Sequence, residues 1–494
     1  MSSETEGAVM DRIDTAEDKA AKAKEVTEKK RLPADTQPKY SFYVEPFKLE
    51  ERPRRFLEAF AAILKHTNYG PVLDAYTRIG AKCSICTASC PVYQTSGDPE
   101  DIPCNRSEML LRIYRRYFTV AGNVKSRLYD YFRLTNEYID ELAESVWRCT
   151  ACKRCKYSCP MGIDHALVTH LARWILAEIG IAPKALVVSV REQLEGTTHN
   201  TSAIPVPALR DTTEFLEEEL EEIYPDAGIG FPIDVEDCEY VFFPAVSDYL
   251  LEADTLMGNA AMLHATGVSW TIGTENFDGI DYGLFYSDRM WERIIKAQVA
   301  EVHRLGGKKM LIGECGHASR SAKEGMANFI PPNQQVPVVN IMELAYQKFM
   351  AGELTMIENA IKERTTYHDP CNIARKGWII EQPRVLLRHI CRDFVEMTPH
   401  GMNNYCCGGG GGSVSIDEIR EFRTLVGGKT KAAQIEATGA HYVVTPCANC
   451  KKQIDEVIKD HGLPQVRTGL HDLMLKAIVL PNGQKPIVRE EEDY

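Results

Sequence analysis

Apolar residues recur every three or four positions along much of the first half of the chain. The period is clearest in RRFLEAFAAILKHT (residues 54–67) and EMLLRIYRRYF (residues 108–118), and it is typical of amphipathic helices that bury one face. We therefore expect residues 39–190 to be mostly helical. An acidic helix, EFLEEELEEIYPDAG (residues 214–228), is expected to present a solvated face within a linker at residues 191–235.

The second half contains an internal repeat in which helical and buried-strand patterns alternate. Residues 300–318 read AEVHRLGGKKMLIGECGHA, and residues 432–450 read AAQIEATGAHYVVTPCANC. Each copy predicts a helix, a glycine stop, a short apolar strand and a cysteine turn, and Cys315 corresponds to Cys447. Strand–helix–strand units of this kind pair their strands in parallel. The repeat therefore predicts two α/β lobes.

Composition excludes several classes of protein. The chain has 494 residues, a hydrophobic content of 44% and a formal net charge of −13, which favour a multidomain globular protein and argue against nucleic-acid binding as its main task. The most apolar stretch, WILAEIGIAPKALVVSV, is interrupted by Glu178, Pro183 and Lys184, so we expect no transmembrane helix. Residues 1–38 are polar, lack the apolar segment of a secretory signal, and are expected to form a disordered tail.

The chain has sixteen cysteines, and they are clustered along the sequence. Because a long chain without a secretory signal is not a secreted disulfide framework, the clustering indicates thiolate metal ligands in a reducing compartment. In CTACKRCKYSCP (residues 149–160), Cys149, Cys152, Cys155 and Cys159 have the C-x2-C-x2-C-x3-C-P spacing of ferredoxins with two [4Fe–4S] cubanes. A zinc site is the alternative, but zinc knuckles use two pairs of ligands and lack this ending.

A partial copy of this motif precedes it. GAKCSICTASCP (residues 80–91) supplies Cys83, Cys86 and Cys90 but has glycine at the first cysteine position. Two cubanes need eight thiolates, so we infer that Cys104 replaces the missing ligand, with a buried free thiol as the alternative. The crossed ligand pattern of two-cluster ferredoxins then assigns one cluster to Cys83, Cys86, Cys104 and Cys159, and the other to Cys90, Cys149, Cys152 and Cys155.

The stretch YCCGGGGGS (residues 405–413) joins two adjacent cysteines to five glycines. A disulfide between neighbours would close a strained ring, and the nearby GGKT lacks the leading glycine and preceding strand of a phosphate loop. Metal binding remains. Five thiolates converge from three strand-to-helix turns of one lobe: Cys371, Cys406, Cys407, Cys447 and Cys450. The glycines permit positive φ and close backbone approach, and we expect them to leave space beside the sulfurs for a substrate.

These motifs together resemble one protein family. YHDPCNIAR, NYCCGGGGG and TPCANC, with GECGHA in the first lobe and the two cubane motifs upstream, are similar to CCG-domain (cysteine-rich) proteins of the heterodisulfide-reductase-like group that includes HdrD, DsrK, HmcF and TmcB. They look closest to DsrK and HmcF. The similarity covers residues 75–475. It implies that the five cysteines of the complete lobe hold a third [4Fe–4S] cluster of CCG type, cubane or non-cubane, at which a disulfide is cleaved or formed.

The first lobe departs from the family pattern. Ala245 and Ala318 stand at two cysteine positions, ENFDG (residues 275–279) replaces Cys-Cys-Gly, and Cys315 remains. One thiolate cannot hold a cluster, so this lobe is expected to be empty. Cys315 and His317 are candidate catalytic residues that would face the cluster of the other lobe as a thiol and a proton donor. Ordinary packing at a turn is the alternative for both.

The resemblance implies a function and a setting. We expect the iron–sulfur subunit of a membrane-associated redox complex, a heterodisulfide-reductase-like thiol/disulfide oxidoreductase of sulfur metabolism. It would pass electrons between a quinone-linked membrane partner and a disulfide or trisulfide. Its catalytic residues would be the five cysteines of the complete lobe with Cys315 and His317, and His368 is a further candidate proton donor.

The implied partners are a membrane-anchoring cytochrome or quinone-interacting subunit, and a small sulfur-carrier protein or low-molecular-weight disulfide. The expected location is cytoplasmic, peripheral on the cytoplasmic side of the inner membrane. The main alternative is an electron-relay subunit of a quinone-linked flavin dehydrogenase, of the glycerol-3-phosphate or glycolate type, with no thiol chemistry of its own. A purely structural zinc protein is a third possibility.

The expected fold class is α+β and multidomain, with a helical two-cluster ferredoxin-like domain followed by two repeated α/β CCG lobes. The expected segments are a tail at 1–38, the helical domain with two [4Fe–4S] clusters at 39–190, the acidic linker at 191–235, the degenerate lobe at 236–350 and the complete lobe at 351–494.

Overall fold

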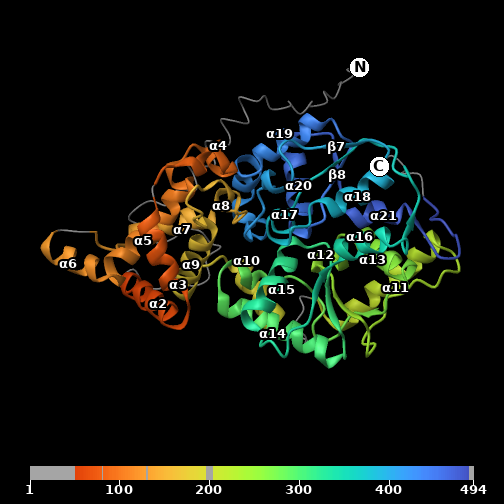
Figure 1. Cartoon of the computed structure of the whole chain (residues 1–494), viewed down its shortest axis with the longest axis horizontal. Coiled ribbons are helices and arrows are strands. Elements are labelled where there is room, and N and C mark those ends of the chain that lie inside the picture. Colours follow the sequence, from red (N-terminus) through yellow and green to blue (C-terminus); the bar gives the residue numbers. More distant parts are fainter. Residues whose placement is uncertain (1–49, 81, 130–131, 196–203, 489–494) are drawn as a thin grey trace, which may run out of the picture.

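The computed structural model describes residues 50–80, 82–129, 132–195 and 204–488. Figure 1 shows the helices of the first third of the chain gathered at one end, with the α/β part of the chain at the other. The mixed helix and sheet architecture expected from the sequence is confirmed. The predicted tail at residues 1–38 lies outside the described residues.

The first part of the described chain is helical. Its main helices are α2 (Arg52–His66), α3 (Tyr69–Ile79), α4 (Pro91–Ser96), α5 (Pro103–Phe118), α6 (Val120–Leu128), α7 (Asn136–Trp147), α8 (Arg154–Ser158), α9 (His165–Glu178) and α10 (Lys184–Glu195), with short turns η1 (Ile85–Ser89) and η2 (Pro99–Asp101). The helices expected at residues 54–67 and 108–118 are found in α2 and α5. Their apolar faces, with Phe60, Leu110 and Ile113, are fully buried, as the period predicts.

Four parallel strands form the first sheet, in the order β2-β1-β3-β4. They are β1 (Tyr240–Phe243), β2 (Trp270–Thr271), β3 (Lys309–Ile312) and β4 (Val338–Asn340). The helical elements between and after them are α12 (Val246–Leu250), α13 (Ala253–Ala265), η3 (Tyr282–Phe285), α14 (Asp288–Arg304), α15 (Gly316–Phe329) and α16 (Ile341–Met350).

The second sheet has the same topology. Its order is β7-β6-β8-β9, again all parallel, so in both sheets the first strand lies between the second and the third. The strands are β6 (Thr365–Tyr367), β7 (Phe394–Glu396), β8 (Tyr442–Val444) and β9 (Val466–Thr468), and the helices are α17 (Cys371–Gly377), α18 (Glu381–Ile390), α19 (Lys429–Thr438), α20 (Ala448–His461) and α21 (Leu470–Leu475). The predicted parallel pairing within an internal repeat is therefore confirmed.

The two α/β units share one apolar core. The acidic helix expected in the linker is α11 (Val206–Ile223), which buries Leu216 and Leu220 in the same core cluster as α13 and α21. A Cβ added at Gly258 of α13 would lie 2.2 Å from the carbonyl oxygen of His471 in α21, so only glycine allows these helices to approach so closely. The short strand β5 (Thr355–Met356) lies between the two units in the sequence. It pairs in antiparallel with β10 (Ile478–Val479), the last described strand. Among the described helices, none combines the length and apolarity that crossing a bilayer requires.

Candidate metal centres

The cysteines of the second sheet gather at one edge. Cys371 opens α17 after β6, and Cys447 caps α20 after β8, with Cys450 in the first turn of α20. The carboxyl ends of neighbouring parallel strands meet at the same sheet edge, and the loop carrying Cys406 and Cys407 returns to it. All five side chains are buried.

These five thiols form a continuous series of contacts. Cys407 Sγ lies 3.4 Å from Cys450 Sγ. Cys406 hydrogen-bonds to Cys371 and Cys407, and Cys450 hydrogen-bonds to Cys447. Hydrogen bonds from Cys406 and Cys450 hold the pKa of Cys407 well below its usual value. Such a group supplies thiolates, which are the iron ligands of iron–sulfur proteins.

The first glycines after the paired cysteines are closely packed. Gly408 has a φ of +105°, and a Cβ there would lie 2.5 Å from the carbonyl oxygen of Arg423. A Cβ at Gly409 would lie 2.8 Å from Gln453 Cβ. The open space expected beside the sulfurs is therefore absent at these two positions, because neighbouring chain fills it. Their role is conformational: the Gly408 N–H turns toward Cys406 Sγ, 3.4 Å away.

The next glycines bring the loop against the cubane motif of the helical part. A Cβ at Gly410 would lie 2.4 Å from the Thr150 carbonyl oxygen. Arg173 of α9 donates to the carbonyl oxygens of Gly411 (2.7 Å) and Cys149 (2.6 Å), so one buried guanidinium joins the two segments. Sequence reasoning missed Arg173 because no motif surrounds it in α9.

The helical part and the five-thiol site meet at a pair of cysteines. The Cys152 thiol hydrogen-bonds to Cys406, and Arg375 donates to the Cys152 carbonyl oxygen at 3.1 Å. Arg375 is 1% exposed, so it ties the two segments together. Electrons passing between the two groups of cysteines would have a short path at this contact.

Four cysteines of the helical part line one small cavity: Cys90, Cys149, Cys152 and Cys155. This is the set that the crossed pattern assigns to one cubane. Arg106 lines the same cavity and is buried, so a positive charge faces the four sulfurs. The Ala151 N–H donates to Cys149 Sγ at 3.4 Å, which is the kind of backbone contact that stabilises a cluster thiolate.

The other predicted set is partly assembled. The Cys86 thiol hydrogen-bonds to Cys104, and this lowers the pKa of Cys104 to about 6. The fold thus brings Cys104 to Cys86, and its role as the ligand missing at Gly80 stays a prediction. Cys83 is exposed and Cys159 is half-buried at the end of α8.

The two cubane motifs have the same backbone turn. Lys82 and Ser84, on either side of Cys83, have φ values of +49° and +58°, and Ala151 and Lys153, on either side of Cys152, have +49° and +61°. Corresponding residues thus adopt the left-handed region in both loops, which few non-glycine residues do. The conformation supports the pairing of the two motifs.

The first lobe contributes one thiol to the shared site. Cys315 contacts Cys447, and the Gly316 N–H donates to Cys447 Sγ at 3.4 Å. His317 Nδ1 lies 3.0 Å from Cys315 Sγ, and His317 lines a small cavity together with four cysteines of the complete lobe. Cys315 and His317 therefore face the five-thiol site. The position where the first lobe lacks its cysteines is closed by packing, since a Cβ at Gly279 would meet Ala318 Cβ at 3.1 Å.

A buried polar chain also reaches these cysteines. Ligand atoms of His368, Cys407 and Cys450 lie within 4.8 Å of one another. His368 Nδ1 lies 3.3 Å from Asn404 Nδ2, and Asn404 Oδ1 accepts from Lys431 Nζ at 2.7 Å. Burial lowers the pKa of Lys431 to about 7. Sequence reasoning proposed His368 but missed Lys431, which follows GGKT in an ordinary helical pattern.

Two protein-family descriptions match parts of the chain. The "4Fe-4S dicluster domain" matches residues 81–163, and the "Cysteine-rich domain" (CCG) matches residues 365–455. The first region contains both cubane motifs with Cys104, and the second contains all five cysteines of the complete lobe. The iron–sulfur cofactors expected from the motifs are thereby confirmed, and the buried thiols with backbone N–H donors fit such clusters.

Known relatives extend the similarity over most of the chain. An "Hdr-like menaquinol oxidoreductase iron-sulfur subunit 2" of Archaeoglobus fulgidus is 26% identical over 88% of this chain and 85% of the relative. The HdrD protein of the dihydromethanophenazine:CoB--CoM heterodisulfide reductase of Methanosarcina barkeri is 24% identical over 78% of this chain and 88% of the relative. This chain is an HdrD-like iron–sulfur protein. The chain is therefore grouped with redox proteins. The assignment of individual cysteines to individual clusters stays a prediction.

Proposed function

We propose that this HdrD-like protein is the iron–sulfur subunit of a membrane-associated complex of the DsrK type. It would pass electrons between a quinone-linked membrane partner and a disulfide or trisulfide substrate of sulfur metabolism, delivered by a small carrier protein or as a free compound. The proposal includes the division into a helical two-cluster domain, a degenerate lobe and a complete lobe. The main support for this proposal is the contact between Cys152 and Cys406, because this contact joins the predicted ferredoxin motif to the five-thiol site.

Disulfide reduction requires two electrons and two protons: RSSR′ + 2e⁻ + 2H⁺ → RSH + R′SH. When bound, the clusters supply one-electron transfer and, at the five-thiol site, iron that can hold sulfur between the two electrons. The protein would orient the disulfide in the cavity between the lobes. His317, 3.0 Å from Cys315 Sγ, would hold a proton for the departing thiolate. The same residues serve the reverse reaction if electrons flow toward the quinone.

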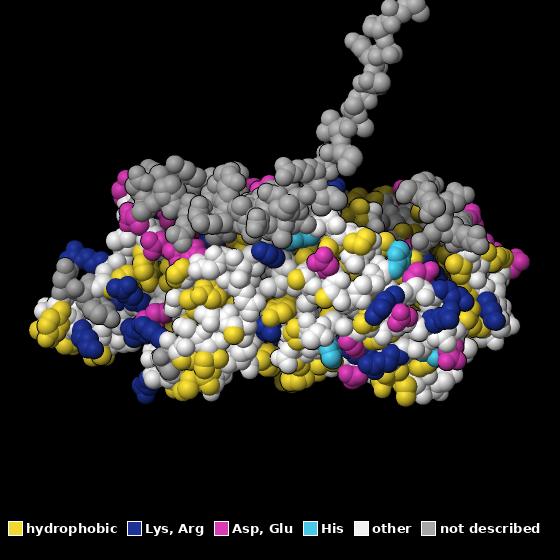
Figure 2. Space-filling model, turned by 90° about the horizontal axis from the view of Figure 1, so that it is seen from above, with side chains coloured by type: hydrophobic (Ala, Val, Ile, Leu, Met, Phe, Trp, Pro, Cys, Tyr) yellow, Lys and Arg dark blue, Asp and Glu magenta, His cyan; other side chains and the backbone are white. Residues whose placement is uncertain are grey.

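We place the protein on the cytoplasmic side of the membrane, and a projecting helix supports the peripheral location itself. In α6 the side chains of Val120, Val124 and Leu128 are 83%, 51% and 69% exposed, and their four-residue spacing puts them on one face. Lys125 and Arg127 lie on the same helix. Figures 1 and 2 show α6 at the end of the molecule, where apolar and basic side chains gather. An exposed apolar stripe with cations suits a membrane surface or an anchoring subunit.

Iron analysis combined with EPR spectroscopy tests the catalytic proposal. Anaerobically reconstituted protein should contain about 12 iron atoms, from three four-iron clusters. The oxidised protein should show a paramagnetic signal that changes when a thiol substrate is added. A Cys447→Ser variant should lose the thiol-sensitive signal and keep the signals of the two reduced cubanes.

The electron-relay alternative predicts a different result. An "EtfAB:quinone oxidoreductase" of Syntrophomonas wolfei is 21% identical over 64% of this chain and 44% of the relative, which is an observation in favour of a relay. About 8 iron atoms, or a full iron content without any response to thiols or disulfides, would favour the relay and reject the catalytic site.

A further inference from the structure

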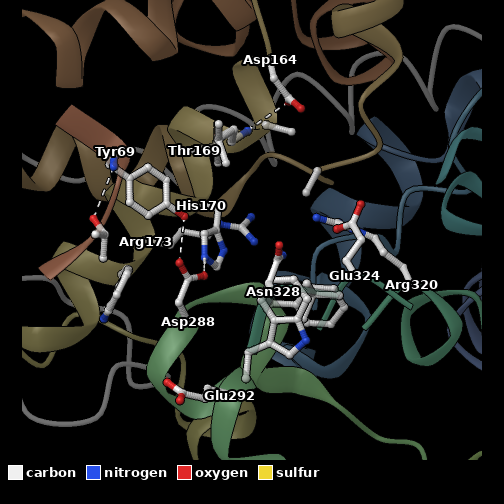
Figure 3. A pocket seen from close by; sticks show the side chains of 18 of the residues that line it. Tyr69, Asp164, Thr169, His170, Arg173, Asp288, Glu292, Arg320, Glu324 and Asn328 are labelled. Atoms are coloured by element: carbon white, nitrogen blue, oxygen red, sulfur yellow. Dashed lines mark hydrogen bonds and ion pairs between the residues drawn. The ribbon is translucent and has the colours of Figure 1, made fainter. Parts of the chain in front are cut away.

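A wide cleft separates the helical part from the first lobe. It has a volume of about 1200 Å³, and its walls come from α9, α14 and α15, with Lys376 at the end of α17. Figure 3 shows its side chains, with His170 and Asp288 in one region and Arg320 and Glu324 in another. No cysteine of the described chain lines the cleft. It is therefore distinct from the metal centres, although it adjoins them.

The cleft shares walls with both groups of cysteines. Ala151 and Lys153, on either side of Cys152, line the cleft and also the cavity of the Cys149 cubane set. Phe285 lines the cleft and also the cavity that holds four cysteines of the complete lobe. Its ring centroid lies 5.3 Å from that of His317. Phe285 is thus the partition between the cleft and the five-thiol site.

The part of the cleft nearest the cysteines has an excess of positive charge. Lys376 Nζ lies 2.6 Å from one oxygen of Glu324, and Arg320 Nε lies 2.8 Å from the other. Lys153 pairs with Asp164 at 3.3 Å. Arg320 and Lys376 therefore share the single carboxylate of Glu324, in a chain whose net charge is −13. An anion entering the cleft would find this region attractive.

The opposite part of the cleft holds the Asp288 carboxylate and is rich in aromatic rings. His170 Nε2 lies 2.7 Å from one oxygen of Asp288, and the Tyr69 hydroxyl donates to the other at 3.0 Å. Trp174 and Trp291 also line the cleft. A ligand with an apolar portion and an anionic group would find a complementary surface for each.

Helix geometry sets the distance between the cations and the sulfur site. Lys376 follows Cys371 by five residues of α17, and Glu324 follows Cys315 by nine residues along α15. At 1.5 Å per residue, an anion bound at this cluster would lie about 8–13 Å from the thiols. A compound with its disulfide and its anionic group separated by a flexible chain of that length could reach both.

We propose that this cleft is the entry and binding site of an anionic disulfide, whose acidic group binds Arg320 and Lys376 while its sulfurs pass Phe285 to reach the five-thiol site. The inference rests on the proposed function and specifies its substrate class. The acidic group can belong to a free small disulfide or to the carboxyl-terminal end of a carrier chain, since both present the same chemistry. The first lobe, which lacks most of its cysteines, would then line the path of the substrate instead of binding a cluster.

Binding can be measured without turnover. Cluster-loaded protein is titrated calorimetrically with disulfides of a short, an intermediate and a long ω-mercaptoalkanoic acid, with the amide of the preferred member, and with a peptide disulfide ending in a free carboxylate. We expect preference for the members that span the distance above, and at least about tenfold weaker binding of the uncharged amide. The double variant Arg320→Gln/Lys376→Gln should lose that preference. Lys348→Gln, which removes one positive charge beside a carboxylate on α16, where Lys348 pairs with Glu353, should not.

Turnover with a reduced viologen dye as electron donor tests the path to the cysteines. The charge variants should raise KM for anionic disulfides by at least about tenfold with little change in kcat. Phe285→Trp should lower kcat/KM for every disulfide while iron content stays normal. The conservative Arg320→Lys variant should recover part of the affinity. Reduction of the free disulfides would show that the acidic group belongs to a small molecule. Reduction of the peptide disulfide alone would show that it belongs to a carrier chain.

The outcomes separate the cleft from the proposed function. If wild-type protein neither reduces a disulfide nor shows a thiol-sensitive signal, the proposed function fails and the cleft proposal fails with it. If wild-type protein reduces disulfides but treats the acid and amide alike, or the double variant binds both as wild type does, the catalytic role stands and the cleft proposal is overturned.

Discussion

Glu314 and Lys451 form a buried ion pair across the two lobes, with Oε2 and Nζ 3.4 Å apart. Glu314 immediately precedes Cys315, and Lys451 immediately follows Cys450. The pair therefore joins the two turns that carry facing thiols. The other Glu314 oxygen lies 2.6 Å from His471 Nδ1, so this carboxylate is held from two directions.

Replacing Lys451 by Met should destabilise the protein by about 3–5 kcal/mol, because it leaves Glu314 buried without its ammonium partner. The double variant Glu314→Gln/Lys451→Met should recover part of that loss. Anaerobic urea unfolding of the four members of the cycle measures the coupling. Strictly additive losses would show that the two side chains act independently.

The free energy of unfolding should depend on pH because of Asp248. Its carboxyl group is buried beside Glu314, and burial raises its pKa to about 8 in the folded protein. The folded state therefore binds one more proton than the unfolded state between about pH 4 and pH 8, so this contribution to stability is lost as pH rises through that range. Asp248→Asn should remove the effect. The melting temperature of the variant relative to wild type should increase from pH 5 to pH 8, and a constant difference would contradict the assignment.

Cys104 is predicted to be the eighth cubane ligand. Cys104→Ala should lower the iron content by up to about four atoms, the content of one cluster, and remove one reduced-cubane EPR signal. Cys391→Ala is the matched control, since Cys391 is a buried thiol at the end of α18 with no motif around it. Unchanged iron content and EPR spectra in Cys104→Ala would show that Cys104 is a free thiol and no cluster ligand.

Gly410 is predicted to set the approach of the two groups of cysteines. Gly410→Ala puts a methyl group 2.4 Å from the Thr150 carbonyl oxygen, so the loop must withdraw, at a cost of about 1–3 kcal/mol. Freeze-quench EPR should show slower reduction of the third cluster, with both cubanes reduced at the normal rate. In Gly70→Ala, where a Cβ meets nothing within 4 Å, these rates should match wild type.

Lys431 is predicted to raise the reduction potential of the cluster at the five-thiol site. At pH 6, below the lowered pKa of about 7, this side chain is protonated, and replacing it by Met should lower that potential by roughly 40–90 mV, which corresponds to about 1–2 kcal/mol of lost Coulomb interaction at an effective dielectric constant near 20. The potentials of the two cubanes should change much less. A redox titration monitored by EPR would measure all three, and equal shifts would argue for a general structural effect.

The sequence was most informative where ligands are encoded locally. Short cysteine spacings identified the cubane motifs, and the alternation of helix and strand patterns predicted two parallel lobes, because neither depends on distant contacts. Cysteine spacing alone did not identify Cys104 as a ligand. The number of thiolates that two cubanes need suggested it, and the fold brings it to Cys86.

Other features depend on contacts between residues far apart in the chain. Arg173 joins Cys149 to Gly411, and Lys431 reaches His368 through Asn404, and no local pattern marks either cation. The expectation of open space at Gly408 and Gly409 was wrong for the same reason. Permissive φ values follow from residue type, whereas the atoms that fill the space come from α20 and from the segment around Arg423.

The contact between Gly258 and the His471 carbonyl has a consequence for biosynthesis. The first lobe is translated long before α21, yet α13 buries its apolar face against that helix. During synthesis the surface of α13 that α21 covers must therefore stay exposed until residues 470–475 have left the ribosome. A chain truncated before residue 470 should be captured by chaperones or degraded.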